Sequence, residues 1–574
     1  MNERLPGAPE KAEGKDGQRM NDRSEGLASL RDTIYAALDR RDFPAARQAI
    51  MRLLPQREAE ALGLWASVGI ESGDAAEAEE AVKKLWRVAP GDAYTRFLAA
   101  RVKFMRGETV APARELAALA REKNIPLAYQ EKIYNLLGQC CRFLGRSEES
   151  VAAYLAASRA AAEPRLAALE YSDYLFNAHY LPPPSPAERR RRAAGYGVFF
   201  KDVTPFLHRW REPEKKLRIG YISPDFRDHV VLRFCAALLT SYDRARFEVY
   251  AYMNAPEDEK SRALAREVDG WRNIFGASSA DAARQIYEDG VDILVDLAGH
   301  TRGGALPVLA YKPAPVQVSG IGYFASTGLP TVDYFLGDVY LDDAAEQDAF
   351  TEKLLVLPHS HFCYAPRGQE PAVASPPCEK NGYVTFGSFN NFAKITDEML
   401  ALWAEILRRV PEARLLLKNV RPGRETLSRM GQRAVRAGID PARLTLCPGS
   451  KDYLRDYLDV DIILDTFPYQ GGGTTCEALF MGLPVVTRAG DRHGARFGAS
   501  LLTNVGLSEL VAESSQAYVE CAVGLACDTE LLAALHTAVP RMMRASPLMD
   551  GGRYVRAMEA AYEMIWERYL NEEA

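Results

Sequence analysis

The sequence lacks several features that mark other classes of protein. None of its 574 residues lies in an apolar run of eighteen or more, so we expect no membrane span. The nine cysteines include no CxxC pair, which argues against a zinc framework or a disulfide scaffold and favours a reducing, cytoplasmic compartment. The formal net charge is −6, whereas nucleic-acid-binding surfaces usually need a basic excess. We therefore expect no nucleic-acid partner.

Two polar segments need separate treatment. Residues 1–28 are rich in Gly, Glu, Lys and Asp and have no apolar core, so we expect a disordered lead-in and no secretory signal. The most basic run is Arg189–Arg192, which follows Glu188. We interpret it as the solvent-exposed face of a helix.

Residues 29–180 show helical periodicity and are rich in Ala, Leu and Glu. A proline recurs every 35 to 38 residues, and a glycine or aspartate recurs between the prolines. This spacing predicts two-helix units of about 34 residues, as in tetratricopeptide repeats, which stack and leave a groove for a polypeptide. A plain helical bundle is the alternative. The recurring residues are Pro55, Pro90, Pro126 and Pro164, with Asp42, Gly73, Gly107 and Gly145 between them.

The composition changes after the repeats. Residues 181–216 begin with a proline-rich stretch to Pro186, expected to be an extended hinge, and continue as a predicted helix from Ala187 to Trp210. Beyond it, short β-rich runs alternate with amphipathic helical stretches, which predicts parallel sheets built from βαβ units. We assign two Rossmann-like halves, 217–378 and 379–574, and expect ligands at the carboxyl ends of their strands. The predicted strands are 217–222, 247–252, 291–296 and 316–320, then 383–386, 413–417, 444–446, 462–465 and 484–487.

The segment Asp465–Leu479 carries the strongest chemical signal. A predicted strand ends at Asp465, a glycine turn comes next, and a helix begins near Thr474. Helix N-termini expose free N–H groups that hold phosphate, and glycines let the backbone approach a ligand closely. No lysine follows the glycines, so the turn is not a P-loop. A tight strand-to-helix turn without a ligand is the alternative.

Two other strand ends carry candidate residues. Lys394 could neutralise a diphosphate leaving group, although a lysine at a helix start is more often a surface residue. His229 can titrate near neutral pH, or it is a loop residue without a role. Asp459-Val460-Asp461 spells the D-x-D metal motif but leads directly into a predicted strand, so we expect no metal site.

Together these segments resemble the O-GlcNAc transferase family, protein glycosyltransferases that combine tetratricopeptide repeats with a GT-B fold. The resemblance covers about Ser29 to Leu570. FNNFAKIT and DTFPYQGGGTTCEAL are most similar to the Spindly branch, whose plant members transfer fucose, and to bacterial relatives. The short segment 366–382, where animal enzymes carry a long insert, is typical of a bacterial member. The matching stretches are YISPDFRDH (221–229), DILVDLAGHTRGG (292–304), KPAPVQVSGIGYFASTGLPTVDY (312–334), FGSFNNFAKIT (386–396), DIILDTFPYQGGGTTCEALFMGLPVVT (461–487) and SLLTNVGL (500–507).

The resemblance implies roles for individual residues. His229 corresponds to the active-site histidine near the acceptor hydroxyl, and Lys394 to the lysine that stabilises the diphosphate. Gly473 replaces a histidine of the animal enzymes, and Tyr453 or a neighbour stands where they have a base-stacking histidine. The implied donor-binding residues are Asn391, Tyr453, Gly472, Gly473, Thr474, Thr475 and, near the ribose, Glu477. The implied residues on the acceptor side of the cleft are Asp225, His300 and Thr301.

The implied reaction is an inverting, metal-independent transfer of a sugar to a Ser or Thr hydroxyl of a protein. Lys394 and the helix start would stabilise the leaving charge, and His229 would orient the acceptor or take its proton. We expect UDP-GlcNAc as donor and neither metal nor cofactor. A GDP-fucose-dependent protein O-fucosyltransferase and a non-enzymatic repeat scaffold on a degenerate transferase fold are the alternatives. The expected acceptor is flagellin or another bacterial surface protein, and self-association through the repeats stays open.

Overall fold

The computed structural model describes residues 28–38, 40–208, 216–343, 345–368, 375–419, 424–450 and 452–573. The predictions for residues 1–27 and for the linker around Trp210 lie outside these ranges. Two compact units are present, and the division between them falls between Tyr171 and Ser172, with Arg424–Thr426 grouped with the first. This division lies inside a helix and precedes the boundary expected at residue 180.

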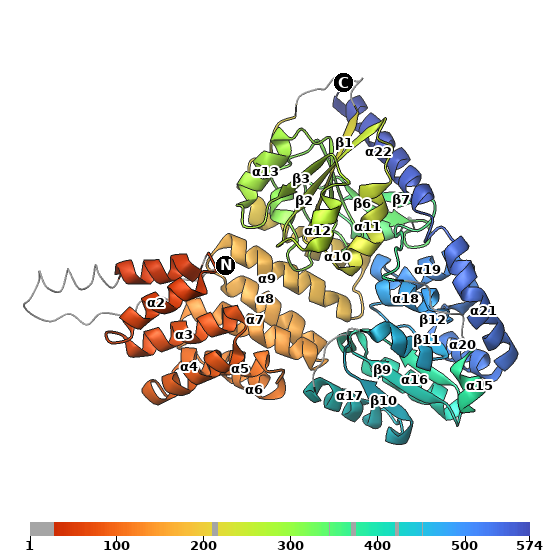
Figure 1. The fold of residues 1–574 in the computed structure, drawn as a ribbon, viewed down its shortest axis with the longest axis horizontal. Helices are drawn as coiled ribbons and strands as arrows, with labels where there is room; N and C mark the ends of the chain where they lie inside the picture. Colours follow the sequence, from red (N-terminus) through yellow and green to blue (C-terminus); the bar gives the residue numbers. More distant parts are fainter. Residues whose placement is uncertain are drawn as a thin grey trace, which may run out of the picture. The chain divides into compact units, whose positions relative to one another are not determined.

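The first unit consists of paired helices (Figure 1). A helix over 28–38 packs with α2, and α3 packs with α4, α5 with α6, and α7 with α8. The helical-repeat prediction is confirmed. The helices are α2 (Phe43–Leu53), α3 (Glu58–Ser72), α4 (Ala75–Val88), α5 (Ala93–Met105), α6 (Val110–Leu119), α7 (Leu127–Phe143), α8 (Ser147–Ala160) and α9 (Pro164–Asn177).

The recurring glycines and prolines take different positions in the repeats. Gly73, Gly107 and Gly145 follow the first helix of a pair with φ of +81°, +86° and +71°, a left-handed conformation that favours glycine. The prolines fall between pairs. Pro126 directly precedes α7 and Pro164 is the first residue of α9, so these two begin a helix, where the missing N–H costs nothing.

The second unit contains two parallel sheets, ordered β3-β2-β1-β4-β5-β6-β7 and β10-β9-β8-β11-β12-β13 (Figure 1). In each sheet the first strand lies inside, the next two extend to one side, and the others extend to the opposite side. This is the doubly wound order in which ligands bind at the carboxyl ends of the strands. The strands are β1 (Leu217–Ser223), β2 (Phe247–Met253), β3 (Gly270–Asn273), β4 (Ile293–Asp296), β5 (Val316–Ser319), β6 (Tyr334–Asp338), β7 (Lys353–Leu357), β8 (Thr385–Ser388), β9 (Arg414–Lys418), β10 (Leu444–Cys447), β11 (Ile462–Leu464), β12 (Val485–Arg488) and β13 (Val511–Ala512).

Several predicted elements differ from those observed. The predicted helix from Ala187 to Trp210 is shorter: α10 (Pro186–Ala194) ends before Gly195, and a 3-10 turn, η2 (Gly197–Phe200), follows. Strands β3, β6, β7 and β13 are not among the predicted ones. The run Arg189–Arg192 is only partly a solvent-exposed face, because the Arg191 side chain is 80% exposed whereas that of Arg189 is 14% exposed.

The last helix, α22 (Gly551–Glu573), returns to the first half and runs along its sheet (Figure 1). The hydroxyls of Tyr562 in α22 and Tyr221 in β1 lie 3.2 Å apart inside the core. In the described part of the chain no single helix is long and apolar enough to cross a membrane, and α20 with α21 satisfies those criteria only as a pair bent by 97°. The other helices are α11 (Val230–Thr240), α12 (Glu259–Leu264), α13 (Ser279–Glu288), α14 (Leu306–Leu309), α15 (Pro377–Asn381), α16 (Asp397–Arg409), α17 (Arg424–Arg436), α18 (Gly473–Phe480), α19 (Phe497–Val505), α20 (Ser515–Cys527) and α21 (Thr529–Ala545).

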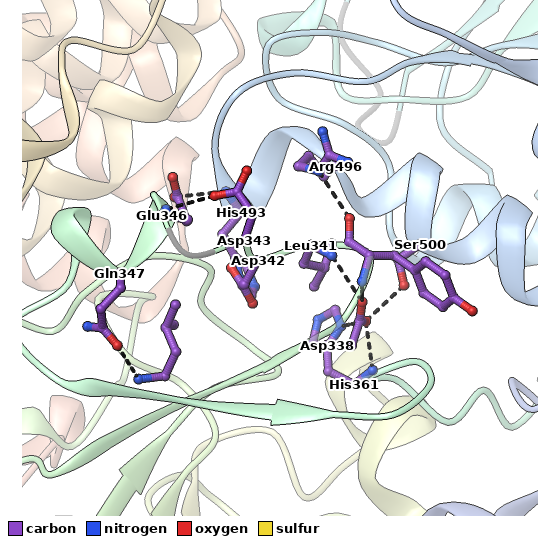
Figure 2. Close-up of polar contacts among 12 residues, drawn as sticks. Asp338, Leu341, Asp342, Asp343, Glu346, Gln347, His361, His493, Arg496 and Ser500 are labelled. Atoms are coloured by element: carbon purple, nitrogen blue, oxygen red, sulfur yellow. Dashed lines mark hydrogen bonds and ion pairs between the residues drawn. The ribbon is translucent and has the colours of Figure 1, made fainter.

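A buried polar cluster joins the two halves (Figure 2). Asp338, at the end of β6, accepts hydrogen bonds from His361 Nδ1 at 2.9 Å and from Ser500 Oγ at 2.8 Å. Asp342 lies 2.8 Å from His493 Nδ1. Burial lowers the pKa of His493, but the carboxylates of Asp342, Asp338 and Glu346 together outweigh burial and raise it overall. Because breaking such a buried pair leaves an unpaired charge, the halves are held in one specific arrangement.

Candidate active site

A cavity of about 410 Å³ lies at the carboxyl ends of the second sheet and is closed on one side by α11 of the first half. Because segments that follow different parallel strands meet at one edge of the sheet, candidates far apart in the sequence converge here. Val230 and Arg233 of α11 complete the lining. The predicted residues that line the cavity are Asn391, Lys394, Tyr453, Gly472, Gly473, Thr474 and Glu477.

Asp465 holds the glycine turn in place through hydrogen bonds. Its Oδ1 accepts the backbone N–H groups of Gly471 at 2.9 Å and Thr466 at 2.8 Å, and its Oδ2 accepts the Thr487 hydroxyl at 2.9 Å. The carboxyl is buried, and burial raises its pKa to about 6. Asp465 therefore fixes the turn rather than contacting a ligand.

The first backbone N–H groups of helix α18 border the cavity and have no partner within the helix. Its first hydrogen bond after the turn runs from Cys476 N to Gly472 O, so the N–H groups of Gly473, Thr474 and Thr475 precede the ladder and can hold an anion. The Thr474 hydroxyl donates to Asn390 Oδ1 at 3.2 Å. Thr475, one of the implied donor-binding residues, does not line the cavity with its side chain, because its buried hydroxyl donates to Gly471 O at 2.9 Å.

Lys394 ends the 3-10 turn η4 (Phe392–Lys394) beside this helix start. Its Nζ donates to Gln470 O at 2.8 Å and lies 3.9 Å from the ring centroid of Tyr469. Among the described residues no carboxylate forms an ion pair with it. Burial lowers its pKa to about 8, against partial opposition from Asp465. The ammonium is thus mostly charged at neutral pH and would gain from an anionic ligand.

Glu477 connects the two halves across the cavity. Its Oε1 accepts hydrogen bonds from the Tyr453 hydroxyl and, at 2.9 Å, from Arg233 Nη1 of α11. Burial raises the pKa of Glu477, and the two donors partly oppose this. The implied ribose contact stays a prediction. Arg233, which sequence reasoning missed, carried no local signal because its partner lies 244 residues away.

Gly473 has little room for a side chain. A Cβ at this position would lie 2.5 Å from Cγ2 of Val230 in α11. The close approach of the two helix starts therefore favours glycine. Gly472 has more room, since the nearest atom to a Cβ there is 3.5 Å away on Phe362.

His229 lies beside the cavity but does not line it. It caps α11, its Nδ1 lies 3.3 Å from Asp225 Oδ1 and 3.4 Å from Val231 N, and its side chain is 42% exposed. Burial lowers the pKa of His229, and Asp225 opposes this only in part. The ring is thus neutral near pH 7. Asp225 Oδ1 and the Val231 N–H compete for Nδ1. When Nδ1 carries the proton it donates to Asp225, the hydrogen bond from Val231 is given up, and Nε2 is the basic nitrogen.

The predicted cleft position of His300 is wrong, whereas that of the partly buried Thr301 stays a prediction. His300 is buried, with Nδ1 2.8 Å from Ser172 Oγ and Nε2 2.9 Å from Thr327 O. Burial lowers its pKa to about 4, so the ring is neutral and both nitrogens are engaged. The Thr301 hydroxyl donates to Ala298 O at 2.7 Å within its own loop. Both residues support the loop after β4.

Several lining residues were missed besides Arg233. Asn390 lies within the quoted FNNFAKIT motif and faces both Thr474 and Lys394. Lys418, at the end of β9, pairs with Asp456 and donates to Pro448 O at 3.0 Å. Its position at a strand end was the available signal. Phe389 and Tyr457 stack with ring centroids 3.9 Å apart.

The second aspartate of the D-x-D motif is occupied by structural hydrogen bonds. Asp461 is buried, and its carboxylate accepts the N–H groups of Thr385 at 2.7 Å and Cys378 at 2.9 Å. Within the described ranges, no three His, Cys, Asp or Glu side chains gather as a ligand set. Asp461 therefore has a structural role at the start of β8, whereas Asp459 is exposed.

The chain matches the model of glycosyl transferase family 41 over residues 197–367 and 379–558. It is 38% identical over 437 residues to the probable UDP-N-acetylglucosamine–peptide N-acetylglucosaminyltransferase SPINDLY of Solanum lycopersicum, covering 72% of this chain and 45% of the relative. It is 24% identical over 489 residues to the UDP-N-acetylglucosamine–peptide N-acetylglucosaminyltransferase of Caenorhabditis elegans, covering 64% and 42%. The chain thus spans about half the length of the curated relatives it matches.

A solved structure matches over a larger share of its length. It is a mutant of the Thermobaculum terrenum O-GlcNAc transferase, 30% identical, with a TM-score of 0.80. The match covers 90% of this chain and 98% of that one. The predicted GT-B fold with N-terminal helical repeats is confirmed.

Proposed function

This chain belongs to glycosyl transferase family 41, and we propose that it transfers N-acetylglucosamine from UDP-N-acetylglucosamine to Ser or Thr hydroxyls of a protein. One observation carries the proposal. Lys394, without a carboxylate partner among the described residues, adjoins the open N-terminus of α18 at a cavity of about 410 Å³. Such a site suits the diphosphate of a nucleotide-sugar.

The reaction is a single inverting displacement. The acceptor oxygen forms a bond to the anomeric carbon while the bond from that carbon to the diphosphate oxygen breaks. Lys394 and the N–H groups of Gly473–Thr475 stabilise the negative charge that develops on the diphosphate. The acceptor proton passes to His229 Nε2 or to solvent, and Asp225 positions the imidazole ring.

The names of the relatives favour UDP-N-acetylglucosamine over GDP-fucose, since both specify it as the donor. The stacked Phe389–Tyr457 pair and Tyr453 offer aromatic surface for the base. The convergence of Lys394 with Thr474 argues against a degenerate scaffold. Because Asp461 is occupied by backbone donors, we also propose that transfer needs no divalent metal.

The proposed acceptor is a polypeptide, since both relatives are named for peptide acceptors. The helical repeats supply the extended surface that a polypeptide needs. Flagellin or another bacterial surface protein is the specific candidate. Incubation of purified candidates with enzyme and donor, followed by intact-mass measurement, tests it through the mass of one added sugar.

The donor is tested by nucleoside diphosphate release from a panel of UDP- and GDP-sugars, with and without EDTA. We expect the fastest release from UDP-N-acetylglucosamine and no effect of EDTA. Preferred turnover of GDP-fucose would establish the fucosyltransferase alternative instead. Absence of release from every donor would favour the scaffold, and recovery of an EDTA-inhibited enzyme by Mn²⁺ would contradict metal independence.

A further inference from the structure

A second cavity, of about 60 Å³, lies within the second unit and shares no lining residue with the donor cavity. It is enclosed by the end of α9 and the start of α10, by the segment that follows β5, and by Arg492 before α19. We call it the arginine pocket. The residues that matter for its chemistry are His179, Arg189, Tyr323, Glu346 and Arg492.

Three buried nitrogens of the arginine pocket lack partners. Among the described residues, Nε of Arg492, Nε of Arg189 and Nδ1 of His179 form no hydrogen bond. The Arg492 residue is 5% exposed and His179 is 8% exposed, so bulk water does not satisfy them. A buried donor without a partner is costly, above all on a charged group. All three belong to residues that line one cavity, and a ligand that accepts hydrogen bonds would satisfy them.

The charged groups of the arginine pocket are only partly paired. Arg189 pairs with Glu346 at 2.5 Å. Glu346 also accepts the His493 N–H (Figure 2). Arg492 forms no ion pair among the described residues. Its Nη2 donates to the carbonyls of His179 at 2.6 Å and Pro468 at 3.2 Å. Arg192, which also lines the pocket, is paired with Glu188. Asp491 and Glu346 favour the charge of Arg492 without forming an ion pair with it, so the buried Arg492 guanidinium can take an anionic partner.

We propose that the arginine pocket binds one small oxyanion, held by Arg492, Arg189 and His179. The volume exceeds what one water needs and is far below that of a nucleotide site. Burial lowers the pKa of His179, so its ring is neutral, and its Nε2 lies 3.1 Å from the Tyr323 hydroxyl. When Tyr323 donates to Nε2, the proton of His179 resides on Nδ1 and points to an acceptor.

The bound anion would support the donor turn. Arg492 donates a hydrogen bond to Pro468 O. The next two residues contact Lys394: Tyr469 through its ring and Gln470 through its carbonyl oxygen. An anion that fixes Arg492 therefore helps to position Lys394, without touching the donor. This consequence for turnover rests on the proposed function, whereas anion binding itself does not.

The test is calorimetric titration of the full-length protein with inorganic phosphate at constant ionic strength. Arg492→Gln should weaken phosphate binding by at least about ten-fold, because a charge-assisted hydrogen bond is lost. Glu346→Gln should strengthen it several-fold, because the opposing carboxylate becomes neutral while the amide oxygen can still accept the His493 N–H. Lys394→Ala, which weakens any phosphate binding in the donor cavity, should leave the binding that depends on Arg492 unchanged.

Two results would overturn the proposal. Binding lost in Lys394→Ala but unchanged in Glu346→Gln would place phosphate in the donor cavity. A selenate-soaked crystal with no anomalous peak between Arg492 and His179 would show that water fills the arginine pocket. The Glu346→Gln variant keeps the test decisive if Arg492→Gln does not fold, because it predicts a gain. Phosphate binding in a protein that turns over no sugar nucleotide would leave this inference standing and remove only the proposed function.

Discussion

The two α/β halves contain the same aspartate pair at equivalent strands, in VDILVD (291–296) and VDIILD (460–465). The first aspartate of each pair, Asp292 or Asp461, accepts a backbone N–H at the start of the neighbouring inner strand. The distances are 2.8 Å to β1 and 2.7 Å to β8. Each pair therefore joins β4 or β11 to the strand beside it in the same way.

The second aspartates, Asp296 and Asp465, support the turns after these strands. Each accepts two backbone N–H groups of its turn and one hydroxyl from the next strand, Ser319 at 2.7 Å or Thr487 at 2.9 Å. Both carboxyls are buried, and burial raises the pKa of each to about 6. The support for the two turns is nearly identical.

The two turns lead into different surroundings. After Asp296 the loop leads to His300, and both ring nitrogens of His300 are hydrogen-bonded to protein groups. After Asp465 the chain enters α18, whose first N–H groups and the adjacent Lys394 border a cavity. The comparison shows that the shared aspartate gives a rigid turn, while the residues after the turn decide whether it serves packing or a ligand.

The largest effect is expected from removing the segment that touches both turns. Ser172 contacts His300 after the first turn, and Phe176 packs against Tyr469 in the second, with ring centroids 6.3 Å apart. We expect removal of residues 1–180 to abolish folding of the catalytic unit and all donor turnover. Removal of residues 1–163 keeps α9 whole and should spare donor hydrolysis while reducing transfer to protein. Thermal melts and nucleotide release measure both.

An active fragment lacking residues 1–180 would show that neither turn depends on this segment. Full transfer to protein by the fragment lacking residues 1–163 would show that the repeats do not help to bind the acceptor. Solubility of both fragments, checked by size-exclusion chromatography, serves as the control.

Lys394→Ala tests whether Lys394 serves the ligand rather than the stability of the fold. Loss of a main electrostatic donor costs at least ~10²-fold in kcat, and the melting temperature should not fall because no ion pair is broken. Lys418→Ala is the matched control, since Lys418 lines the same cavity but is paired with Asp456. We expect a smaller loss there. Equal losses in both variants, or near-normal turnover in Lys394→Ala, would remove the special role of Lys394.

Asp296→Asn and Asp465→Asn test whether the two supports are equivalent. The folded pKa of each aspartate, about 6, lies above its unfolded value, so the unfolded chain releases its proton first. Stability therefore falls as pH rises from about 4 to 6, by up to about 1.4 kcal/mol per pH unit for each group. Each substitution should flatten that slope in urea unfolding measured across this window.

Only Asp465→Asn should also reduce donor turnover, because the Asp465 turn alone leads to the cavity. A flattened slope in one variant but not in the other would show that the supports are not equivalent. A turnover defect in Asp296→Asn as large as in Asp465→Asn would link the first turn to catalysis.

The smallest effect is expected on the free energy of unfolding, when the glycine in each turn region is replaced by alanine. Gly473→Ala places Cβ 2.5 Å from Val230 Cγ2 and should cost about 1–2 kcal/mol, with most of the loss recovered in the double variant with Val230→Ala. Gly299→Ala is the contrasting case. Its φ of +52° stays strained when Tyr323, the close neighbour, is truncated. A double-mutant cycle that finds no coupling between Gly473 and Val230 would contradict this.

The fold was largely predictable because its strands form apolar runs with turn signals on either side. Leu217–Ile222 and Ile462–Asp465 belong to such runs, and both predictions lie within a residue of the observed β1 and β11. The missed strands lack this pattern. β3 is the four-residue run Gly-Trp-Arg-Asn, and β7 alternates buried with exposed residues at the edge of its sheet. Pairing with a neighbouring strand, rather than local propensity, decides both.

The site was predictable only where function follows a strand end. Lys394 and Thr474 satisfy that condition and do meet at one cavity. His300 also follows a strand end, yet its Nδ1 is hydrogen-bonded to Ser172, which lies far away in the sequence. The sequence predicts an exposed Arg189 because its partner, Glu346, lies 157 residues further along the chain. Partners at such separations leave no local pattern.

The return of α22 to the first half has a consequence for folding during synthesis. Tyr562 packs against Tyr221 of β1, and both belong to the buried core. The ribosome completes β7 about 200 residues before it reaches Tyr562, a delay of roughly 10–40 s at ordinary elongation rates. During that interval the first sheet is fully synthesised but lacks the helix that covers part of its core. Part of the first half's core therefore stays uncovered during synthesis, and the second half completes its own sheet before α22 covers the first.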